Sequence, residues 1–186
     1  MNTNKRKFLV LLLALTACFQ VGDVFAQKIM SEIKNPQIVV EKKKRNLKLY
    51  DGKKLFKTYK ISLGAVPVGD KEIEGDGKTP EGEFYVFTKN DKSSFFLSLG
   101  LSYPNKEDAE RGIKANLITQ AEHDEIIRAI DAKEMPLQKT KLGGEIYIHG
   151  GGCNADWTQG CMALENDEMQ EIFDVTAVGT TVLIKP

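Results

Sequence analysis

Apolar and polar residues alternate through the first part of the chain, with the period of a half-buried β-strand. Two runs show this alternation, at Leu47 and Leu49, and at Tyr59, Ile61 and Leu63. Between them, Asp51-Gly52 is a strong signal for a tight turn. The pattern therefore predicts strands joined by a hairpin. The basic run EKKKR at residues 41–45 is short and faces this hairpin, so we predict a solvated turn there.

More strands are predicted farther along. The stretch GDGKTPEG at residues 75–82 is punctuated by glycine and proline, and simple turn chemistry accounts for it. It leads into a predicted strand at 84–88. SFFLSLGLSYP gives another strand that stops at Pro104. GEIYIHG at 144–150 and GTTVLIKP at 179–186 return to strand character, the latter as a closing strand.

Between residues 105 and 142 the spacing changes to that of helices. Ile126, Ile127 and Ile130 fall on one side of a helix whose other positions are charged. Thr119, with Glu122 three residues on, has the capping-box pattern. A further short helix, NDEMQEIFDV, has Asn166 as its candidate N-cap. The prediction is a mainly β protein with a helical insertion at about 105–142, where a lid or pocket wall would be useful.

Composition agrees with one soluble globular domain. Of 186 residues, 41% are hydrophobic and 28% are charged. Without residues 1–26, 23 positive and 25 negative side chains remain, a net charge of −2. This charge gives no indication of a polyanionic partner such as nucleic acid. The remaining chain of about 160 residues is long enough for one substantial core.

The N-terminus has the pattern of an export signal. NKRK is followed by the apolar run FLVLLLALTACF, too short to span a bilayer comfortably. Small residues before Ala26 favour cleavage there, giving a signal peptide at 1–26, a short linker at 27–35 and a folded domain at 36–186. The alternative is a lipoprotein signal at 1–17, because LTAC resembles a lipobox that would leave Cys18 lipidated and membrane-anchored. Either way, we expect an exported protein of the periplasm or cell envelope.

The candidate chemistry lies in EIYIHGGGCNADWTQGCMAL, residues 145–164. This stretch places His149, Cys153 and Cys161 within thirteen residues, although the chain has only two histidines and three cysteines. One interpretation is a cysteine nucleophile with a histidine base. A thiol with an unperturbed pKa of roughly 8.5 needs a base to take its proton at neutral pH. Gly160 allows close backbone approach and amides for an oxyanion, and His149 ends a predicted strand.

Two other interpretations stay open on the residues alone. His149, Cys153 and Cys161 are three conceivable zinc ligands, but their spacing matches no common zinc finger or ribbon, and His123 looks like a surface residue. A disulfide between Cys153 and Cys161 would close a small loop in an exported protein. It would not explain the histidine or the Gly-Cys dipeptide. No nucleotide, haem or metal motif is present, so no cofactor is predicted.

Two separated motifs resemble the L,D-transpeptidase catalytic domain family of bacterial cell-wall enzymes, over about residues 36–186. One is SLGAVPVGDKEIEGDGKTPEGEFYV, and the other is IHG followed by DWTQGCMAL. The resemblance implies a β-sandwich-like fold and peptidoglycan stem peptides as partners. Cys161 would be the nucleophile and His149 the base, steadied by a hydroxyl or a backbone carbonyl. The amides of Gly160 and Cys161 would bind the oxyanion, and Gly150 completes the His-Gly motif.

The resemblance also suggests residues that contact the substrate. Thr158 is at the motif's Ser/Thr position, where it would orient the histidine or line the pocket. Asp156 and Trp157 are candidates for shaping the pocket, and Tyr103, Lys106 and Arg111 for contacting the stem. Many members have arginine two residues after the cysteine, but this sequence has Ala163. That change predicts altered handling of the stem carboxylate, because a guanidinium binds carboxylates in a bidentate way.

The expected activity is transpeptidation through a thioester on Cys161. Within the same chemistry, an L,D-carboxypeptidase, or an amidase acting at the diamino acid, is the close alternative, because the sequence does not reveal the acceptor. The alternative from a different class is a non-catalytic envelope protein that binds glycan or stem peptide, with Cys153 and Cys161 locked together.

Overall fold

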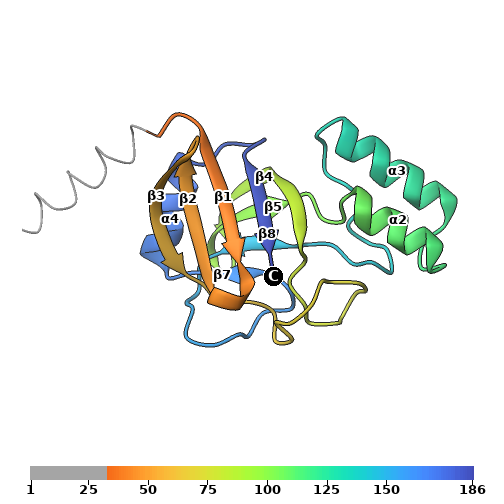
Figure 1. The fold of residues 1–186 in the computed structure, drawn as a ribbon, viewed down its shortest axis with the longest axis horizontal. Coiled ribbons are helices and arrows are strands. Elements are labelled where there is room, and N and C mark those ends of the chain that lie inside the picture. Colours follow the sequence, from red (N-terminus) through yellow and green to blue (C-terminus); the bar gives the residue numbers. More distant parts are fainter. Residues whose placement is uncertain (1–32) are drawn as a thin grey trace, which may run out of the picture. The chain divides into compact units, whose positions relative to one another are not determined.

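The computed structural model describes residues 33–186 (Figure 1). The predicted signal peptide at 1–26, the candidate lipidation site Cys18 and most of the predicted linker lie outside these residues. None of the helices in the described part is long and apolar enough to cross a membrane.

One eight-stranded sheet forms the body of the described chain, in the order β3-β2-β1-β8-β4-β5-β6-β7 (Figure 1). Its strands are β1 (Pro36–Glu41), β2 (Asn46–Asp51), β3 (Lys54–Lys60), β4 (Gly82–Ser93), β5 (Phe96–Leu101), β6 (Tyr147–His149), β7 (Met162–Ala163) and β8 (Thr181–Lys185). The β1–β8 and β6–β7 pairs are parallel, and the other pairs are antiparallel. The sheet curls, and the mainly β prediction is confirmed.

Local sequence explains the first hairpin. Leu47 and Leu49 of β2 point into the core and are fully buried, as their alternation predicts. Gly52 has a φ of +56°, so it occupies the left-handed conformation that this turn requires. The Asp51 carboxylate accepts hydrogen bonds from the amides of Lys34 and Asn35, which holds the incoming chain against the turn.

The predicted solvated turn at 41–45 forms, with Lys43 and Lys44 exposed, but the prediction is wrong for Lys42. These residues form a 3-10 turn, η1 (Lys42–Lys44), and only 2% of the Lys42 side chain is exposed. Its ammonium donates to the carbonyl of Thr79 at 2.7 Å and to the Glu81 carboxylate at 2.9 Å. A buried ammonium needs such partners, and they come from residues almost forty positions away, which local charge patterning does not reveal.

The helical insertion forms as predicted. It contains α2 (Lys106–Lys114) and α3 (Gln120–Asp131), and Thr119 with Glu122 makes the predicted capping box. Ile126 is fully buried in a small core with Ala109, Ile118 and Leu142. Ile127 and Ile130 pack against the same core. The insertion is anchored to the sheet where the Tyr103 hydroxyl, just after β5, donates to the carbonyl of Leu142 at 2.8 Å.

The last helix, α4 (Asn166–Val175), begins differently from the prediction. Asn166 is the first helical residue and not the N-cap, which is Glu165. The Asn166 side chain instead accepts a hydrogen bond from the amide of Gly151 at 2.9 Å. The Asn166 side chain, which the local sequence predicts as the cap of α4, therefore binds the glycine run after β6 instead.

Candidate active site

His149 is the last residue of β6 and only 4% of it is exposed. Its Nδ1 lies 2.6 Å from the carbonyl oxygen of Gly150. A carbonyl only accepts, so Nδ1 carries the proton and Nε2 is unprotonated in the neutral ring. The imidazole is therefore in the tautomer that a general base needs, and the backbone carbonyl of Gly150 fixes it.

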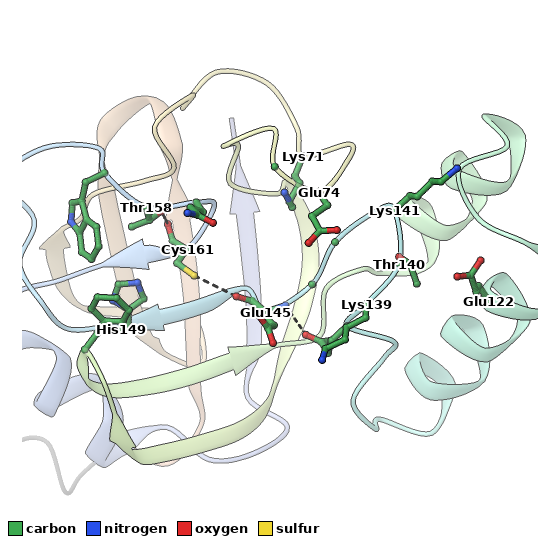
Figure 2. Close-up of a pocket in the computed structure, with 17 residues that line it drawn as sticks. Lys71, Glu74, Glu122, Lys139, Thr140, Lys141, Glu145, His149, Thr158 and Cys161 are labelled. Atoms are coloured by element: carbon green, nitrogen blue, oxygen red, sulfur yellow. Dashed lines mark hydrogen bonds between the residues drawn. The ribbon is translucent and has the colours of Figure 1, made fainter.

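Cys161 immediately precedes β7, which pairs in parallel with β6. In that register His149 lies opposite Ala163 and Ile148 opposite Met162, so the cysteine is two positions from the histidine's partner on the neighbouring strand. Both side chains line one cavity of about 940 Å³ (Figure 2). The structure thus brings together the two residues that the sequence singles out.

The thiol does not point at the imidazole in this conformation. Its Sγ donates to the carbonyl of Glu145 at 3.5 Å and accepts from the amide of Tyr147 at 3.4 Å (Figure 2). These are weak contacts, because a thiol is a poor hydrogen-bond donor and acceptor, and rotation about one bond can break them. Attack with His149 as base therefore requires the thiol to leave Glu145 by rotation about its Cα–Cβ bond.

Burial sets the resting protonation of both groups. Desolvation raises the pKa of the Cys161 thiol to about 11, and the Tyr147 amide and the positive charge of Lys71 oppose this rise. Burial also lowers the pKa of His149 below its usual value, although the Gly150 carbonyl favours the protonated ring. At neutral pH these shifts favour a neutral thiol and a neutral imidazole in the resting site.

Alkylation of Cys161 should therefore depend steeply on pH. With a thiol pKa of about 11, the thiolate fraction, and with it the iodoacetamide rate, should rise about 100-fold between pH 7 and pH 9. Peptide mapping after timed alkylation measures the rate at Cys161 separately from Cys153. A rate that stays flat between pH 6 and pH 9 would instead indicate a resting thiolate–imidazolium pair.

Thr158 stabilises the turn that leads into Cys161. Its hydroxyl donates to the Cys161 carbonyl at 2.7 Å and accepts from the Gly160 amide at 3.2 Å. Thr158 also lines the cavity, but its hydroxyl is committed to this turn and does not bond to His149. Of the two roles predicted for Thr158, the structure therefore agrees with lining the pocket and not with orienting His149.

The predicted oxyanion site at Gly160 needs correction. Because its amide donates to Thr158, it is not free to bind an oxyanion in this conformation. Gly160 is required for another reason: its φ is +125°, and a Cβ would lie 2.7 Å from the Lys78 carbonyl. The GDGKTPEG loop is therefore packed directly against the residue before the nucleophile.

Of the other predicted site residues, Trp157 lines the cavity, whereas Tyr103 and Asp156 do not. Tyr103 is fully buried and its hydroxyl bonds to Leu142, so the predicted stem contact is wrong. The Asp156 carboxylate accepts from the Arg45 guanidinium at 2.8 to 3.1 Å and from the Leu63 amide at 2.9 Å. It ties the nucleophile loop to η1 and the strand region after β3 and does not shape the pocket.

The two basic candidates of the insertion also point elsewhere. Arg111 binds Asp70 and Asp108, and Lys106 pairs with Asp131. Neither lines the cavity of Cys161. The position of the family arginine, Ala163, is fully buried and its backbone pairs with Ser62.

Replacing Asp156 by alanine should cost stability and leave substrate binding intact. The change strands the Arg45 guanidinium and the Leu63 amide, which should lower the free energy of unfolding by about 2 kcal/mol. Urea unfolding measures it, with Asp131→Ala as control, because that exposed pair with Lys106 should contribute little. If Asp156→Ala instead raises the KM for the stem peptide and leaves the free energy of unfolding unchanged, Asp156 takes part in substrate binding.

Cys153 takes no part in the cavity. Both cysteines are free, and the Cys153 thiol lies 3.5 Å from the Glu165 carboxylate, which also accepts from the Cys153 amide. The disulfide is not formed in this structure. Within residues 33–186, no group of three histidine, cysteine or acidic side chains is arranged to hold a metal ion.

Sequence reasoning missed several residues that line the cavity. Lys71 has a 3% exposed side chain and donates to the Asp76 carboxylate at 2.9 Å and to the Ile73 carbonyl at 3.0 Å. Lys71 lines the cavity, but its ammonium is already bound to Asp76 and Ile73; Lys139 and Lys141 also line the cavity. Phe95 at the tip of the β4–β5 hairpin also lines the cavity, as do Glu122 of α3 and Glu145, so the insertion contributes one wall (Figure 2). Nothing in their residue types distinguishes them beforehand.

Comparisons with known proteins give one family model and several solved structures of similar fold. The YkuD L,D-transpeptidase catalytic domain model matches residues 35–184. Among solved structures, the chain resembles the helical cell shape determining protein Pgp2 from Campylobacter jejuni, with a TM-score of 0.56 and 23% identity over 87% of this chain and 56% of that one. It also resembles Bd1075 from Bdellovibrio bacteriovorus, with a TM-score of 0.53 and 19% identity over 83% of this chain and 49% of that one.

The chain thus spans about half the length of these two structures, and at such identities they show a shared fold. A search of curated proteins gives no significant match. The family model covers most of the sequence, including both motifs and both residues of the cavity that carry the candidate chemistry. The chain therefore belongs to the L,D-transpeptidase catalytic domain family.

Proposed function

We propose that the protein is a cysteine-dependent acyltransferase that acts on peptidoglycan stem peptides. The observation that carries the proposal is the shared cavity of Cys161 and His149, in which Nδ1 of the imidazole carries the proton and the cysteine immediately precedes the neighbouring strand β7. Membership of the family supplies the substrate class. The predicted export signal at 1–26 would carry the enzyme to the cell envelope.

The first half-reaction forms a thioester. His149 Nε2 takes the thiol proton while Cys161 Sγ attacks the carbonyl carbon of the third stem residue, a diamino acid. The tetrahedral intermediate then collapses as the bond to the terminal D-alanine breaks, and the imidazolium returns its proton to the leaving amine. The products are the acyl-enzyme and free D-alanine.

The second half-reaction decides the outcome. An amine from another stem can attack the thioester with His149 again as base, which gives a crosslink and regenerates the thiol. Water in the same position gives a shortened tripeptide stem. Because Pgp2 is a cell shape determining protein with this fold, we propose that the reaction edits the cell wall in a way that affects shape.

Incubation with purified tetrapeptide muropeptides tests the proposal. Mass spectrometry of the products should detect released D-alanine together with either a crosslinked dimer or a tripeptide. A dimer assigns transpeptidation, and a tripeptide alone assigns L,D-carboxypeptidase activity. Unchanged muropeptides with intact protein would count against both and favour a binding protein.

A further inference from the structure

Two aromatic rings enclose the imidazole of His149. Phe95 stacks on it, with ring centroids 4.7 Å apart and planes inclined by 29°. Trp157 meets it edge-on, at 5.6 Å and 68°. Phe95 and Trp157 also contact each other, with centroids 5.5 Å apart. The three rings form one cluster at the wall of the cavity.

The backbone around the cluster is shaped to allow this contact. Phe95 lies between β4 and β5, where its amide donates to the Ser93 hydroxyl and Phe96 adopts a φ of +74°. A Cβ on Gly150 would lie 2.9 Å from the Phe95 carbonyl, and one on Gly151 would lie 3.5 Å from the Phe95 ring. The glycines after His149 therefore make room for the hairpin tip.

Trp157 is anchored from the other side. Its indole N–H donates to the carbonyl of Gly152 at 3.2 Å. Even so, 42% of Trp157 and 46% of Phe95 remain exposed. Large aromatic residues left so accessible beside a buried histidine are not explained by core packing, because burying them elsewhere would be more favourable.

The imidazole has little other support for a positive charge. Its hydrogen-bond partner is the neutral carbonyl of Gly150, where other cysteine and serine enzymes often place a carboxylate or amide. When Nε2 takes the thiol proton, the ring becomes a cation in a buried position. The stacked face of Phe95 offers the electron density that stabilises such a cation.

We propose that Phe95 and Trp157 are positioning residues that hold the His149 ring, and that the stacked face of Phe95 stabilises the protonated ring during acyl transfer. The inference rests on the proposed role of His149 as the base. Phe95 would thereby stabilise the imidazolium, as an acidic third residue does in other catalytic triads, while the Gly150 carbonyl fixes the tautomer.

Charged groups do not provide a competing explanation. The titratable groups that line the cavity with the ring are Lys71, Glu74, Glu122, Lys139, Lys141, Glu145 and Cys161, and those on the flanking segments are Asp91, Lys92, Asp156 and Glu165. None of them is among the causes that move the pKa of His149, which are burial and the Gly150 carbonyl. A change at Phe95 that preserves apolar cover therefore changes mainly the interaction of the two rings.

The test is an NMR titration of the His149 ring in the full-chain protein. A His123→Gln background leaves a single histidine, and His123 lies on α3 away from the cavity. Phe95→Leu keeps apolar cover but removes the π face, and should lower the His149 titration midpoint by about 0.5 to 1 pH unit. Phe95→Tyr keeps the ring and should titrate as the parent does. Thermal unfolding verifies that both variants fold.

Kinetics provide the second readout. Phe95→Leu should lower kcat for D-alanine release about 3- to 10-fold with KM within twofold, and Phe95→Tyr should restore kcat. Equal midpoints for the Leu and Tyr variants, or a raised midpoint in Phe95→Leu, would overturn the proposal. So would a higher KM with an unchanged titration, which would make Phe95 a substrate contact. The NMR titration requires no substrate turnover, so it tests the interaction of Phe95 with His149 even if the protein does not have the proposed activity.

Discussion

Replacement of Cys161 by alanine is expected to abolish D-alanine release from tetrapeptide stems, with a loss of roughly 10⁴-fold or more. The reason is that the thioester cannot form without the sulfur, whereas His149 and the cavity remain. Cys161 makes only two weak contacts through its thiol, so the variant should fold normally. A coupled assay for free D-alanine, together with thermal unfolding, measures both effects.

Cys153→Ala is the matched control. Its thiol is buried against Glu165 and does not line the cavity, so the variant should keep most of the activity. Equal loss in the two variants would indicate that the cysteines act together, as in a metal site or an obligatory disulfide. Loss of activity in Cys153→Ala but not in Cys161→Ala would show that Cys153, and not Cys161, is the nucleophile.

Among these substitutions, Gly64→Ala should lower the free energy of unfolding most. Gly64 lies where the two family motifs cross: a Cβ there would be 2.1 Å from the Gly77 carbonyl oxygen and 3.2 Å from the Gly160 Cα. Its amide also donates to the Thr79 hydroxyl. Relieving this clash would require backbone atoms of Gly77 and Gly160 to shift, so the free energy of unfolding should fall by about 3 kcal/mol or more. Activity should fall as well, because Gly160 precedes the nucleophile.

Gly52→Ala separates this clash from ordinary backbone strain. Gly52 has a φ of +56° but nothing within 4 Å of a Cβ, so alanine should cost about 1 kcal/mol and leave activity unchanged. Urea unfolding of both variants makes the comparison. If Gly64→Ala is no worse than Gly52→Ala, the two motifs are not packed backbone to backbone as the structure has them.

Local patterns predicted the elements well and their long-range contacts poorly. Alternation located β2, and the capping box at Thr119 located the start of α3, because both signals depend on neighbours in sequence. The second alternating run is displaced from β3 (Lys54–Lys60), which contains Tyr59 but not Ile61 or Leu63. Lys42 was misassigned because its partners Thr79 and Glu81 come from a distant loop. Asn166 has the correct chemistry for a cap, but Gly151 competes for its side chain.

The candidate site follows the same rule. His149 and Cys161 were predicted because their residue types are rare in this chain and chemically specific. Tyr103 and Asp156 were misassigned because hydroxyls and carboxylates serve structure as readily as binding, and here they bond to Leu142 and Arg45. Phe95 was missed since only the fold brings the hairpin tip to the imidazole.

The central claim is that the Cys161 sulfur accepts an acyl group with His149 as its base. Intact-protein mass spectrometry after brief exposure to a tetrapeptide stem tests it most directly, with peptide mapping to locate the adduct. We predict a mass gain equal to the stem without its terminal D-alanine, carried on the peptide that contains Cys161 and absent from His149→Ala. Folded protein that gains no mass, or gains it on Cys153, would contradict the account.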